Sequence, residues 1–600
     1  MKKSLMPFIC VLIVSIIPVH SFARYDPGWK WRTIKTENFT IYYPEGHEQF
    51  AQRVVSLSDE VYGDVTGYLG VKPRRCPVVL NPGTDMFNGF MSIFPNRISL
   101  FETPLYTVRG FGPGSDLMDI VYTHEYTHFV HLTSCTGWYG ALTRIVGDGM
   151  ALSNFLSPMW IIEGITTNTE TMFSDGGRGR CPLFKGKFMS FTEGKGLWSL
   201  SSAGTVSPYA PPGGSRFYLA GYHMVEYMNR TYGEDAFSRL SQYQTRHPIG
   251  GSRKAIQHVT KKSAQTFYKE FLADFEKKTR DLKEITMADS LPSGKVVLSE
   301  PIDGIVFQFW TDNETIQAIR TGYDRKTAII EIQPDTGEII REIRTGILNI
   351  VSAKRTPDGR FVFGTPFYKL FGEGDLDVSD LIVFDPETKK YSRLTKGTHI
   401  YSADLSPDGK IFVAARRNGM WIECILLDED GSSVRTLVSK TGLLCEAPRW
   451  SPDGSMIAAV IKIGRNSDII IINPETGTMN MLFKSDIQED NEPSFSPDGR
   501  WIVFSSNRSG IWNIYAWDTI EKKLFQLTSV LYYAGDPEVS PDGKTLSFLS
   551  QHRGVNRLCT IPFDPHTGRE IHVEKGDMLD NPFISLQEPE VTFESRGFRS

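Results

Sequence analysis

Residues 406–414 read Ser-Pro-Asp-Gly-Lys-Ile-Phe-Val-Ala, a tight turn followed at once by an apolar run. Proline presets φ at the first turn position, aspartate accepts hydrogen bonds from nearby backbone amides, and glycine tolerates positive φ. The apolar run is typical of a buried strand. The stretch therefore predicts a turn that leads into a β-strand, and its aspartate is interpreted as structural, neither catalytic nor calcium-binding.

The same turn recurs through the C-terminal half of the chain. Its copies begin at residues 356, 406, 451, 496 and 540, so that their prolines lie 50, 45, 45 and 44 residues apart. One further step of 45 residues towards the N-terminus falls on a degenerate copy, residues 311–314. A period near 45 with short strands in every unit is typical of a β-propeller. We therefore expect an all-β propeller of six blades over residues 291–600.

The repeated Ser-Pro-Asp-Gly-Lys/Arg turn before an apolar strand resembles the TolB-like propeller family. The resemblance implies that a protein of the cell envelope docks on the propeller.

The N-terminal half has a mixed pattern. Residues 39–43 and 97–101 read as strands, whereas apolar side chains at helical spacing run through residues 50–68 and 265–283. Leu-Pro-Ser-Gly at residues 291–294 then breaks the pattern. These features predict a multidomain chain, with an α+β domain at residues 24–290 ahead of the propeller.

Residues 1–23 have the features of a secretory signal peptide. Two lysines precede an apolar run at residues 5–19, and small residues three apart end at Ala23. The run is short for a bilayer span, so cleavage after Ala23 is expected, with an uncleaved anchor helix as the alternative. No later segment offers about 20 apolar residues. A periplasmic or secreted chain without a transmembrane segment is predicted.

The charge balance bears on possible partners. With 65 Lys and Arg against 70 Asp and Glu, the formal net charge is −5. Nucleic-acid binding usually needs a broad basic surface, so nucleic acid is not an expected partner.

Residues 124–128 read His-Glu-Tyr-Thr-His within an apolar segment. On a helix, positions four apart lie one turn above each other, so His124 and His128 are expected to share one metal ion. Glu125 lies about 100° around the helix, where it can reach a bound water without being a ligand. This HExxH arrangement predicts one Zn²⁺ per chain, with Glu125 as general base.

The third ligand comes from a resemblance. A metzincin would need histidine at residue 134, which is serine, whereas residues 160–166 read Trp-Ile-Ile-Glu-Gly-Ile-Thr. This segment resembles the Trp-x-x-Glu-Gly-x-Ala segment of gluzincins, and the N-terminal half is similar to the peptidase MA-like gluzincins, which are found fused to TolB-like propellers. The resemblance implies Glu163 as the third ligand. The 35 residues between His128 and Glu163 exceed the gap in better-known gluzincins.

Two neighbouring residues have alternative interpretations. His131 lies seven residues after His124 on the same helical face, so it could approach the metal, although capping or packing at the rim of the site is favoured. Glu170 is interpreted as an acceptor that orients a ligand imidazole. A solvent-facing helix acid is the alternative for Glu170.

Gluzincins also take an oxyanion donor from a tyrosine or histidine downstream of the third ligand. Tyr218 stands 55 residues after Glu163, near the spacing in aminopeptidase-N-like enzymes, and is the predicted donor. Tyr222 is the reserve and His223 a more distant one. Simple packing of both tyrosines on the zinc helix is the alternative.

The strand at residues 96–101 is expected to form an antiparallel edge that binds an extended peptide through Asn96, Ile98 and Leu100. The Gly-x-Met-Glu-Asn segment of aminopeptidase-N-like enzymes does not occur, which favours an endopeptidase. The predicted function is an exported zinc peptidase whose propeller serves docking or access control. The alternative is a protein-binding propeller protein of the cell envelope with a vestigial or regulatory peptidase half.

Overall fold

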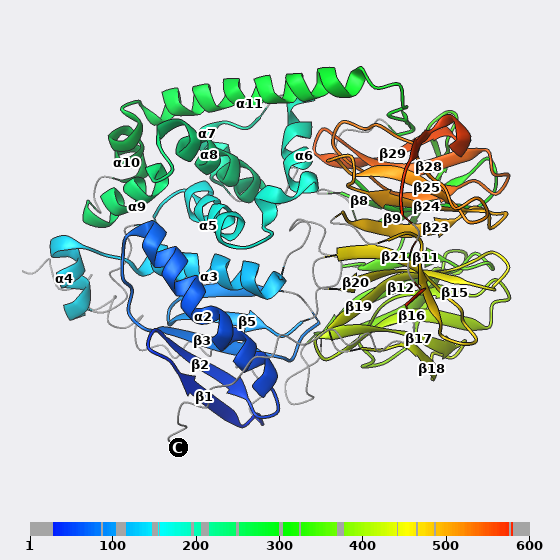
Figure 1. Cartoon of the computed structure of the whole chain (residues 1–600), viewed down its shortest axis with the longest axis horizontal. Helices are drawn as coiled ribbons and strands as arrows, with labels where there is room; N and C mark the ends of the chain where they lie inside the picture. The colour runs from blue at the N-terminus through cyan, green and yellow to red at the C-terminus, as the bar shows by residue number, and fades with distance from the viewer. Residues whose placement is uncertain are drawn as a thin grey trace, which may run out of the picture.

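The computed structural model describes residues 28–579, apart from residues 86–87, 104–115, 147–153, 155, 194–196, 206–214, 248–250, 299–303, 323–325, 348, 369–376, 441, 464–465, 485–487, 575 and 577. The chain is multidomain, with an N-terminal α+β region beside a C-terminal all-β region (Figure 1). The predicted signal peptide lies outside the described residues. Among the helices that are described, none is long and apolar enough to cross a membrane.

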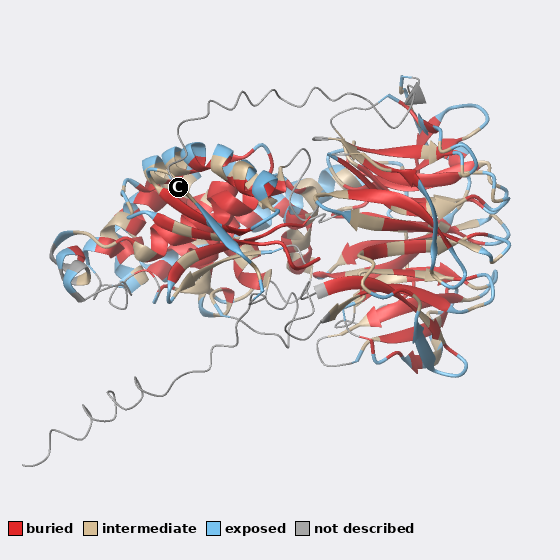
Figure 2. Cartoon of the chain, turned by 90° about the horizontal axis from the view of Figure 1, so that it is seen from below, coloured by how far each residue is buried: buried red, intermediate tan, exposed pale blue. Residues whose placement is uncertain are grey.

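A five-stranded sheet with the order β1-β2-β3-β5-β4 underlies the N-terminal region. Its central strands β2, β3 and β5 run parallel, while β1 and β4 pair antiparallel at the two edges. Helices α2 and α3 pack against the sheet, and apolar side chains of these strands and helices form one core. The buried residues are drawn red in Figure 2. The elements are β1 (Trp31–Lys35), β2 (Phe39–Pro44), α2 (Glu48–Leu69), β3 (Cys76–Asn81), β4 (Gly89–Ile93), β5 (Asn96–Phe101) and α3 (Leu117–Thr133).

The prediction that residues 96–101 form the sheet edge is wrong. β5 pairs with β3 on one side and with β4 on the other. Ile98 and Leu100 are fully buried and Asn96 is nearly so, because the apolar side chains of β5 belong to the core beneath α3. The half-buried strand β4 therefore occupies the edge that had been assigned to Asn96, Ile98 and Leu100.

The second part of the N-terminal region is helical. The long helix α11 runs along its top and leads towards the propeller (Figure 1). The elements are α4 (Gly137–Val146), α5 (Met159–Phe173), η2 (Arg178–Arg180), α6 (Pro182–Ser190), η3 (Phe191–Glu193), α7 (Leu200–Ala203), α8 (Arg216–Tyr232), α9 (Ala236–Arg246), α10 (Gly251–Thr260) and α11 (Ala264–Met287).

The C-terminal region consists of small, mostly antiparallel sheets. A four-stranded sheet contains β7 (Gly304–Trp310), β8 (Ile316–Thr321), β9 (Ala328–Gln333) and β10 (Glu338–Arg344), and the next contains β11 (Ser352–Arg355), β12 (Phe361–Tyr368), β13 (Asp377–Asp385) and β14 (Lys390–Arg393). A nine-stranded sheet contains β15 (Ile400–Leu405), β16 (Ile411–Asn418), β17 (Trp421–Asp428), β18 (Ser433–Val438), β19 (Leu443–Trp450), β20 (Ile457–Ile463), β21 (Asn466–Ile472), β22 (Met479–Met481) and β31 (Met578–Leu579).

The last two sheets involve strands from distant parts of the chain. One contains β23 (Asp490–Phe495), β24 (Trp501–Ser506), β25 (Asn513–Asp518), β26 (Leu524–Gln526) and β30 (Arg569–Ile571), the last of which follows η5 (Pro565–Thr567). The other contains β27 (Ala534–Val539), β28 (Thr545–His552), β29 (Val555–Pro562) and β6 (Lys295–Val296). Because β6 precedes all the other strands of this region, its pairing with β29 ties the beginning of the region to its end.

The repeated turns have the predicted local structure. In the turn at residues 406–409, Ser406 Oγ donates to Asp408 Oδ1 at 2.6 Å, and the backbone N–H of Gly409 donates to the carbonyl of Ser406 at 2.9 Å. Gly409 has φ of 77°, which favours glycine at this position. The aspartate is thus used for local structure.

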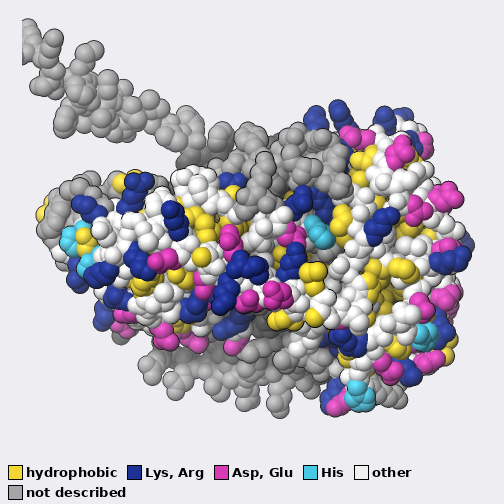
Figure 3. Space-filling view, turned by 90° about the horizontal axis from the view of Figure 1, so that it is seen from above, with side chains coloured by type: hydrophobic (Ala, Val, Ile, Leu, Met, Phe, Trp, Pro, Cys, Tyr) yellow, Lys and Arg dark blue, Asp and Glu magenta, His cyan; other side chains and the backbone are white. Residues whose placement is uncertain are grey.

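Charged side chains are mixed on the surface. On the face drawn in Figure 3, Lys and Arg side chains are interspersed with Asp and Glu side chains.

Candidate metal centre

The buried helix α3 carries the His-Glu-Tyr-Thr-His segment. Asp116 caps its N-terminus, accepting from the backbone N–H of Met118 at 3.0 Å. Nearly every residue of α3 is buried, because the sheet lies on one side and helices on the other. A helix enclosed in this way places its polar side chains in a low-dielectric interior, where they need partners.

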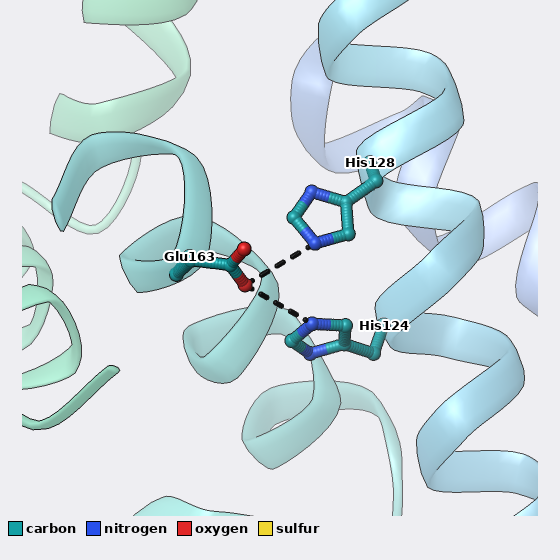
Figure 4. Close-up of side chains that lie close together, drawn as sticks. All are labelled: His124, His128 and Glu163. Carbon is teal, nitrogen blue, oxygen red and sulfur yellow. Dashed lines mark ion pairs between the residues drawn. The ribbon is translucent and has the colours of Figure 1, made fainter. Parts of the chain in front are cut away.

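Three donor atoms converge beside α3. Oε2 of Glu163, on α5, lies 3.4 Å from Nε2 of His124 and 3.3 Å from Nε2 of His128 (Figure 4). The exposed fractions of His124, His128 and Glu163 are 5%, 8% and 7%. The helical spacing and the distant Glu-Gly segment thus bring these side chains to a common point.

The geometry of this cluster fits a zinc ion. Ligand bonds of about 2.0–2.1 Å in tetrahedral zinc sites imply about 3.3–3.4 Å between donor atoms, which agrees with the two distances to Glu163. Oε2 of Glu163 is buried and has no hydrogen-bond partner among the described residues. A buried carboxylate oxygen in that condition needs an explanation, and a shared cation supplies one.

Close packing of α5 and α8 determines where Glu163 lies. A Cβ atom on Gly164 would come within 2.6 Å of the carbonyl carbon and oxygen of Gly221, and one on Gly221 would come within 2.4 Å of the carbonyl oxygen of Trp160. The two helix backbones therefore touch at this pair of glycines. The glycine that follows Glu163 is explained by this contact.

Glu170 lies behind His124, as its predicted role requires. Its Oε2 is 2.7 Å from Nδ1 of His124, and its carboxylate is fully buried. Burial raises the pKa of Glu170, but the charge and hydrogen bonds of Arg178 outweigh burial and lower that pKa to about 2. The structure therefore disagrees with the alternative of a solvent-facing acid.

The electrostatics of the cluster favour a positive charge at its centre. Burial and Arg178 lower the pKa of His124, yet Glu163 and Glu170 outweigh them and raise it to about 9. Burial raises the pKa of Glu163, but the two histidines outweigh it and lower that pKa. Burial raises the pKa of Glu125. Without a metal, the acids would attract a proton to His124, and a divalent cation could take its place.

Tyr218 is the tyrosine of α8 that lies beside the cluster. Its ring centroid is 6.2 Å from that of His124, and burial, followed by the charge of Glu163, raises the pKa of its hydroxyl. Tyr222 and His223 point elsewhere: the hydroxyl of Tyr222 donates to the carbonyl of Gly179 at 3.4 Å, and His223 stacks on Phe188.

His131 does not join the three donor atoms. Its ring packs edge-on against Phe237 at a centroid distance of 6.2 Å, and it is 1% exposed. Burial, followed by the charge of His128, lowers its pKa to about 3, so that it is a neutral ring. This placement agrees with packing, the favoured interpretation of His131.

The edge strand β4 approaches α3 next to Glu125. A Cβ atom on Gly89 would lie 2.5 Å from Cγ1 of Val121 and 3.1 Å from Cγ of Glu125. The absence of a side chain at Gly89 lets the strand lie directly against the helix.

Arg178 was missed by the sequence analysis. Its guanidinium donates to both carboxylate oxygens of Glu170, at 2.8 Å and 2.7 Å. The chain reads Gly-Gly-Arg-Gly-Arg at residues 176–180, which has no ligand spacing. Only the fold of this turn against α5 could identify Arg178 as a partner of the site.

Comparisons with known proteins concern the propeller. Residues 424–596 match the family model "PD40: TolB beta propeller domain". A stretch of 116 residues, 19% of this chain, is 36% identical to "Protein TolB homolog" of Chlorobium chlorochromatii (strain CaD3). The match spans 26% of that relative, about a quarter of its length. The C-terminal part of the chain is therefore a TolB-like β-propeller, as its repeated turns predicted.

Several solved structures are similar to part of this chain. The putative TolB from Agrobacterium tumefaciens is 20% identical, with 40% of this chain and 84% of that chain covered and a TM-score of 0.31. TolB from Acinetobacter baumannii is 17% identical, with 51% and 72% covered and a TM-score of 0.30. An oligogalacturonate lyase in complex with manganese is 15% identical, with 45% and 80% covered and a TM-score of 0.33.

Proposed function

We propose that this chain is an exported protein of the cell envelope with two functional parts. Residues 291–600 form a six-bladed TolB-like propeller that binds a protein partner. Residues 24–290 form a gluzincin-like domain that holds one Zn²⁺ and hydrolyses peptide bonds, most readily within a chain. The signal peptide at residues 1–23 would direct the protein to the periplasm or the exterior.

The two parts have different kinds of support. The family match and the TolB homologue favour a protein-interaction module, and so they favour the alternative of a binding protein whose peptidase half is vestigial or regulatory. Hydrolysis is supported only by the geometry of His124, His128 and Glu163. The propeller's binding role is therefore the better supported part of the proposal.

Six blades are the simplest division of the sheets. The nine-stranded sheet counts as two blades, because a single parallel bridge between Ile422 and Leu444 joins its two antiparallel groups. The sheet that contains β6 counts as the last blade. Closure by a strand from each end of the domain is a common way to remove exposed sheet edges.

The observation that carries the hydrolytic proposal is the convergence of His124, His128 and Glu163 on one point. Zinc held there would polarise a substrate carbonyl and lower the pKa of a bound water towards about 7. Glu170 accepts from Nδ1 of His124 and so leaves its Nε2 lone pair directed at the cluster. In this proposal, His124, His128 and Glu163 are the zinc ligands and Glu170 is their supporting acid.

Other residues of the chain have defined tasks in this proposal. Glu125, whose pKa is raised by burial, accepts a proton from the attacking water and passes it to the leaving amine. Tyr218, whose hydroxyl stays protonated because its pKa is raised, donates to the oxyanion. β4 takes the substrate-binding task first assigned to β5, since it is the edge strand among the described residues and lies next to Glu125.

The test uses the purified mature chain and its Glu125→Gln variant, with zinc content and hydrolysis of generic peptides as readouts. Hydrolysis that needs both zinc and Glu125 supports the peptidase. An intact chain that lacks hydrolysis but still binds an envelope protein supports the alternative. Mapping cleavages in envelope proteins with both forms would then identify substrates.

A further inference from the structure

The guanidinium of Arg178 completes the surroundings of Glu170. Its Nε donates to Oε1 at 2.8 Å and its Nη2 to Oε2 at 2.7 Å, while the backbone N–H of Arg178 donates to Oε1 at 3.0 Å. Glu170 is 0% exposed. A carboxylate buried to this degree is tolerated only with an opposite charge and satisfied lone pairs. Arg178 supplies the charge and three of the hydrogen bonds.

Glu170 also bonds to His124, one of the proposed metal ligands. Oε2 lies 2.7 Å from Nδ1 of His124, and Nη2 of Arg178 lies 2.8 Å from the same nitrogen. A guanidinium can only donate, so Arg178 would bond to Nδ1 only if that nitrogen had no hydrogen. The carboxylate is the stronger partner for an N–H group. By holding Oε2 beside Nδ1, Arg178 favours the tautomer in which Nε2 is free.

Arg178 also contacts the candidate oxyanion donor. Its guanidinium carbon lies 4.6 Å from the ring centroid of Tyr218. A cation at this distance from an aromatic face is attracted to it. One side chain therefore supports a histidine of α3, an acid of α5 and a tyrosine of α8.

We propose that Arg178 is a positioning residue of the metal site, which keeps Glu170 against His124 and keeps the ring of Tyr218 in place. The inference rests on the proposed metal site. Lysine is not an equivalent replacement for Arg178, because an ammonium group lacks the rigid planar fork with which a guanidinium pairs with a carboxylate and stacks on an aromatic face.

Arg180 offers a matched control on the same short helix. Its Nη1 donates to the backbone carbonyls of Ser174 and Gly176 and not to the carboxylate of Glu170. Arg178→Lys and Arg180→Lys therefore make the same chemical change two residues apart. A difference between them reports on the link to Glu170 rather than on the turn.

The experiment measures the affinity of the full chain for zinc by chelator competition and the visible spectrum of its cobalt-substituted form. Arg178→Lys is expected to weaken zinc binding by about 10- to 100-fold and to change the cobalt spectrum. Arg180→Lys should bind zinc within about twofold of the wild type. In a Glu170→Gln background, Arg178→Lys should add little further loss, because both changes break one chain of contacts.

Several results would overturn the inference. Wild-type zinc affinity and cobalt spectrum in Arg178→Lys would do so, as would equal losses in the two lysine variants. A full additional loss from Arg178→Lys in the Glu170→Gln background would show that Arg178 does not act through Glu170. A wild-type chain that binds no zinc would overturn the proposed metal site together with this inference, whereas the other results leave the metal site standing.

Discussion

Oδ1 of Asp85 lies 2.9 Å from Nη1 of Arg417, and this ion pair joins the N-terminal region to the propeller. Asp85 also accepts from Nδ1 of His399 at 2.8 Å and from the backbone N–H of Ser379 at 2.7 Å. Nη2 of Arg417 in turn donates to the carbonyl of Glu102 at 2.6 Å. Because the Asp85 side chain is 0% exposed and that of Arg417 is 8% exposed, the contact is a buried charge network.

The first prediction concerns this network. Arg417→Ala leaves a buried carboxylate without its cation, a change that typically costs about 3–5 kcal/mol. We expect the variant to unfold in two separate thermal transitions and to be cut more readily between its halves by limited proteolysis. The control is Arg360→Ala, which removes an exposed pair with Asp358 and should leave stability within about 1 kcal/mol. If Arg417→Ala unfolds in the same transition and at the same Tm as the wild type, the ion pair does not stabilise the protein.

The second prediction separates zinc ligands from the base. His124→Ala and Glu163→Ala should lose zinc, as measured by metal analysis after dialysis. Glu125→Gln should keep zinc but lose hydrolysis by about 100-fold or more, since general-base catalysis typically contributes that much. His131→Ala is the control and should keep zinc. Full occupancy in Glu163→Ala would place the third ligand elsewhere.

The third prediction concerns the oxyanion donor. Tyr218→Phe should lower kcat/KM by about 100-fold with zinc content and Tm unchanged, because only a hydroxyl that serves the transition state is removed. Tyr222→Phe is the matched control, since its hydroxyl bonds to the carbonyl of Gly179. A large loss in Tyr222→Phe with normal turnover in Tyr218→Phe would assign the role to the other tyrosine.

The fourth prediction concerns the contact between α5 and α8. Gly164→Ala would bring a methyl group within 2.6 Å of the Gly221 backbone. Overpacking of this kind costs about 1–3 kcal/mol and should shift Glu163, so both Tm and zinc affinity should fall. Gly67→Ala, on α2 with nothing within 4 Å of its new methyl group, should be neutral or slightly stabilising. Equal effects of the two substitutions would refute the close-packing argument.

The fifth prediction concerns pH and the propeller. Burial raises the pKa of Glu538 to about 7; Lys354 opposes the shift and Asp536 adds to it. The folded state therefore holds the proton of Glu538 more tightly than the unfolded state does. The stability that this proton contributes is fully present below about pH 4.5, and it is lost as pH rises from there through the folded pKa of about 7. Glutamine does not titrate, so the free energy of unfolding of Glu538→Gln should rise relative to that of the wild type as pH increases from 5 to about 8. Urea unfolding at each pH measures this difference. A constant difference across that range would contradict the raised pKa.

Local features could be predicted from the sequence because their causes are local. The repeated Ser-Pro-Asp-Gly turns stand in the structure with the expected bonds, as at Ser406 and Asp408, because proline, aspartate and glycine constrain the backbone within four residues. The spacing of four residues predicted that the imidazoles of His124 and His128 point the same way from the helix, because the pitch of a helix is independent of the fold around it.

The sequence pattern could not predict features that depend on how distant segments pack together. β4 and β5 have similar strand patterns, and only the pairing of β5 with β3 determined that β4 is the edge strand in the described part of the chain. Arg178 lies in the short helix η2 and Asp85 in a bend after β3, neither in a recognisable sequence spacing, and their partners lie on other elements.

The sequence by itself thus determined the repeated strands of the propeller and the helical pair of histidines, because short-range backbone and helix geometry specify both. The tertiary structure alone decided which of the described strands lies at the sheet edge, which arginine bonds to Glu170, and how Arg417 contacts the N-terminal region. Those contacts join residues far apart in the chain, and their geometry depends on how whole elements pack.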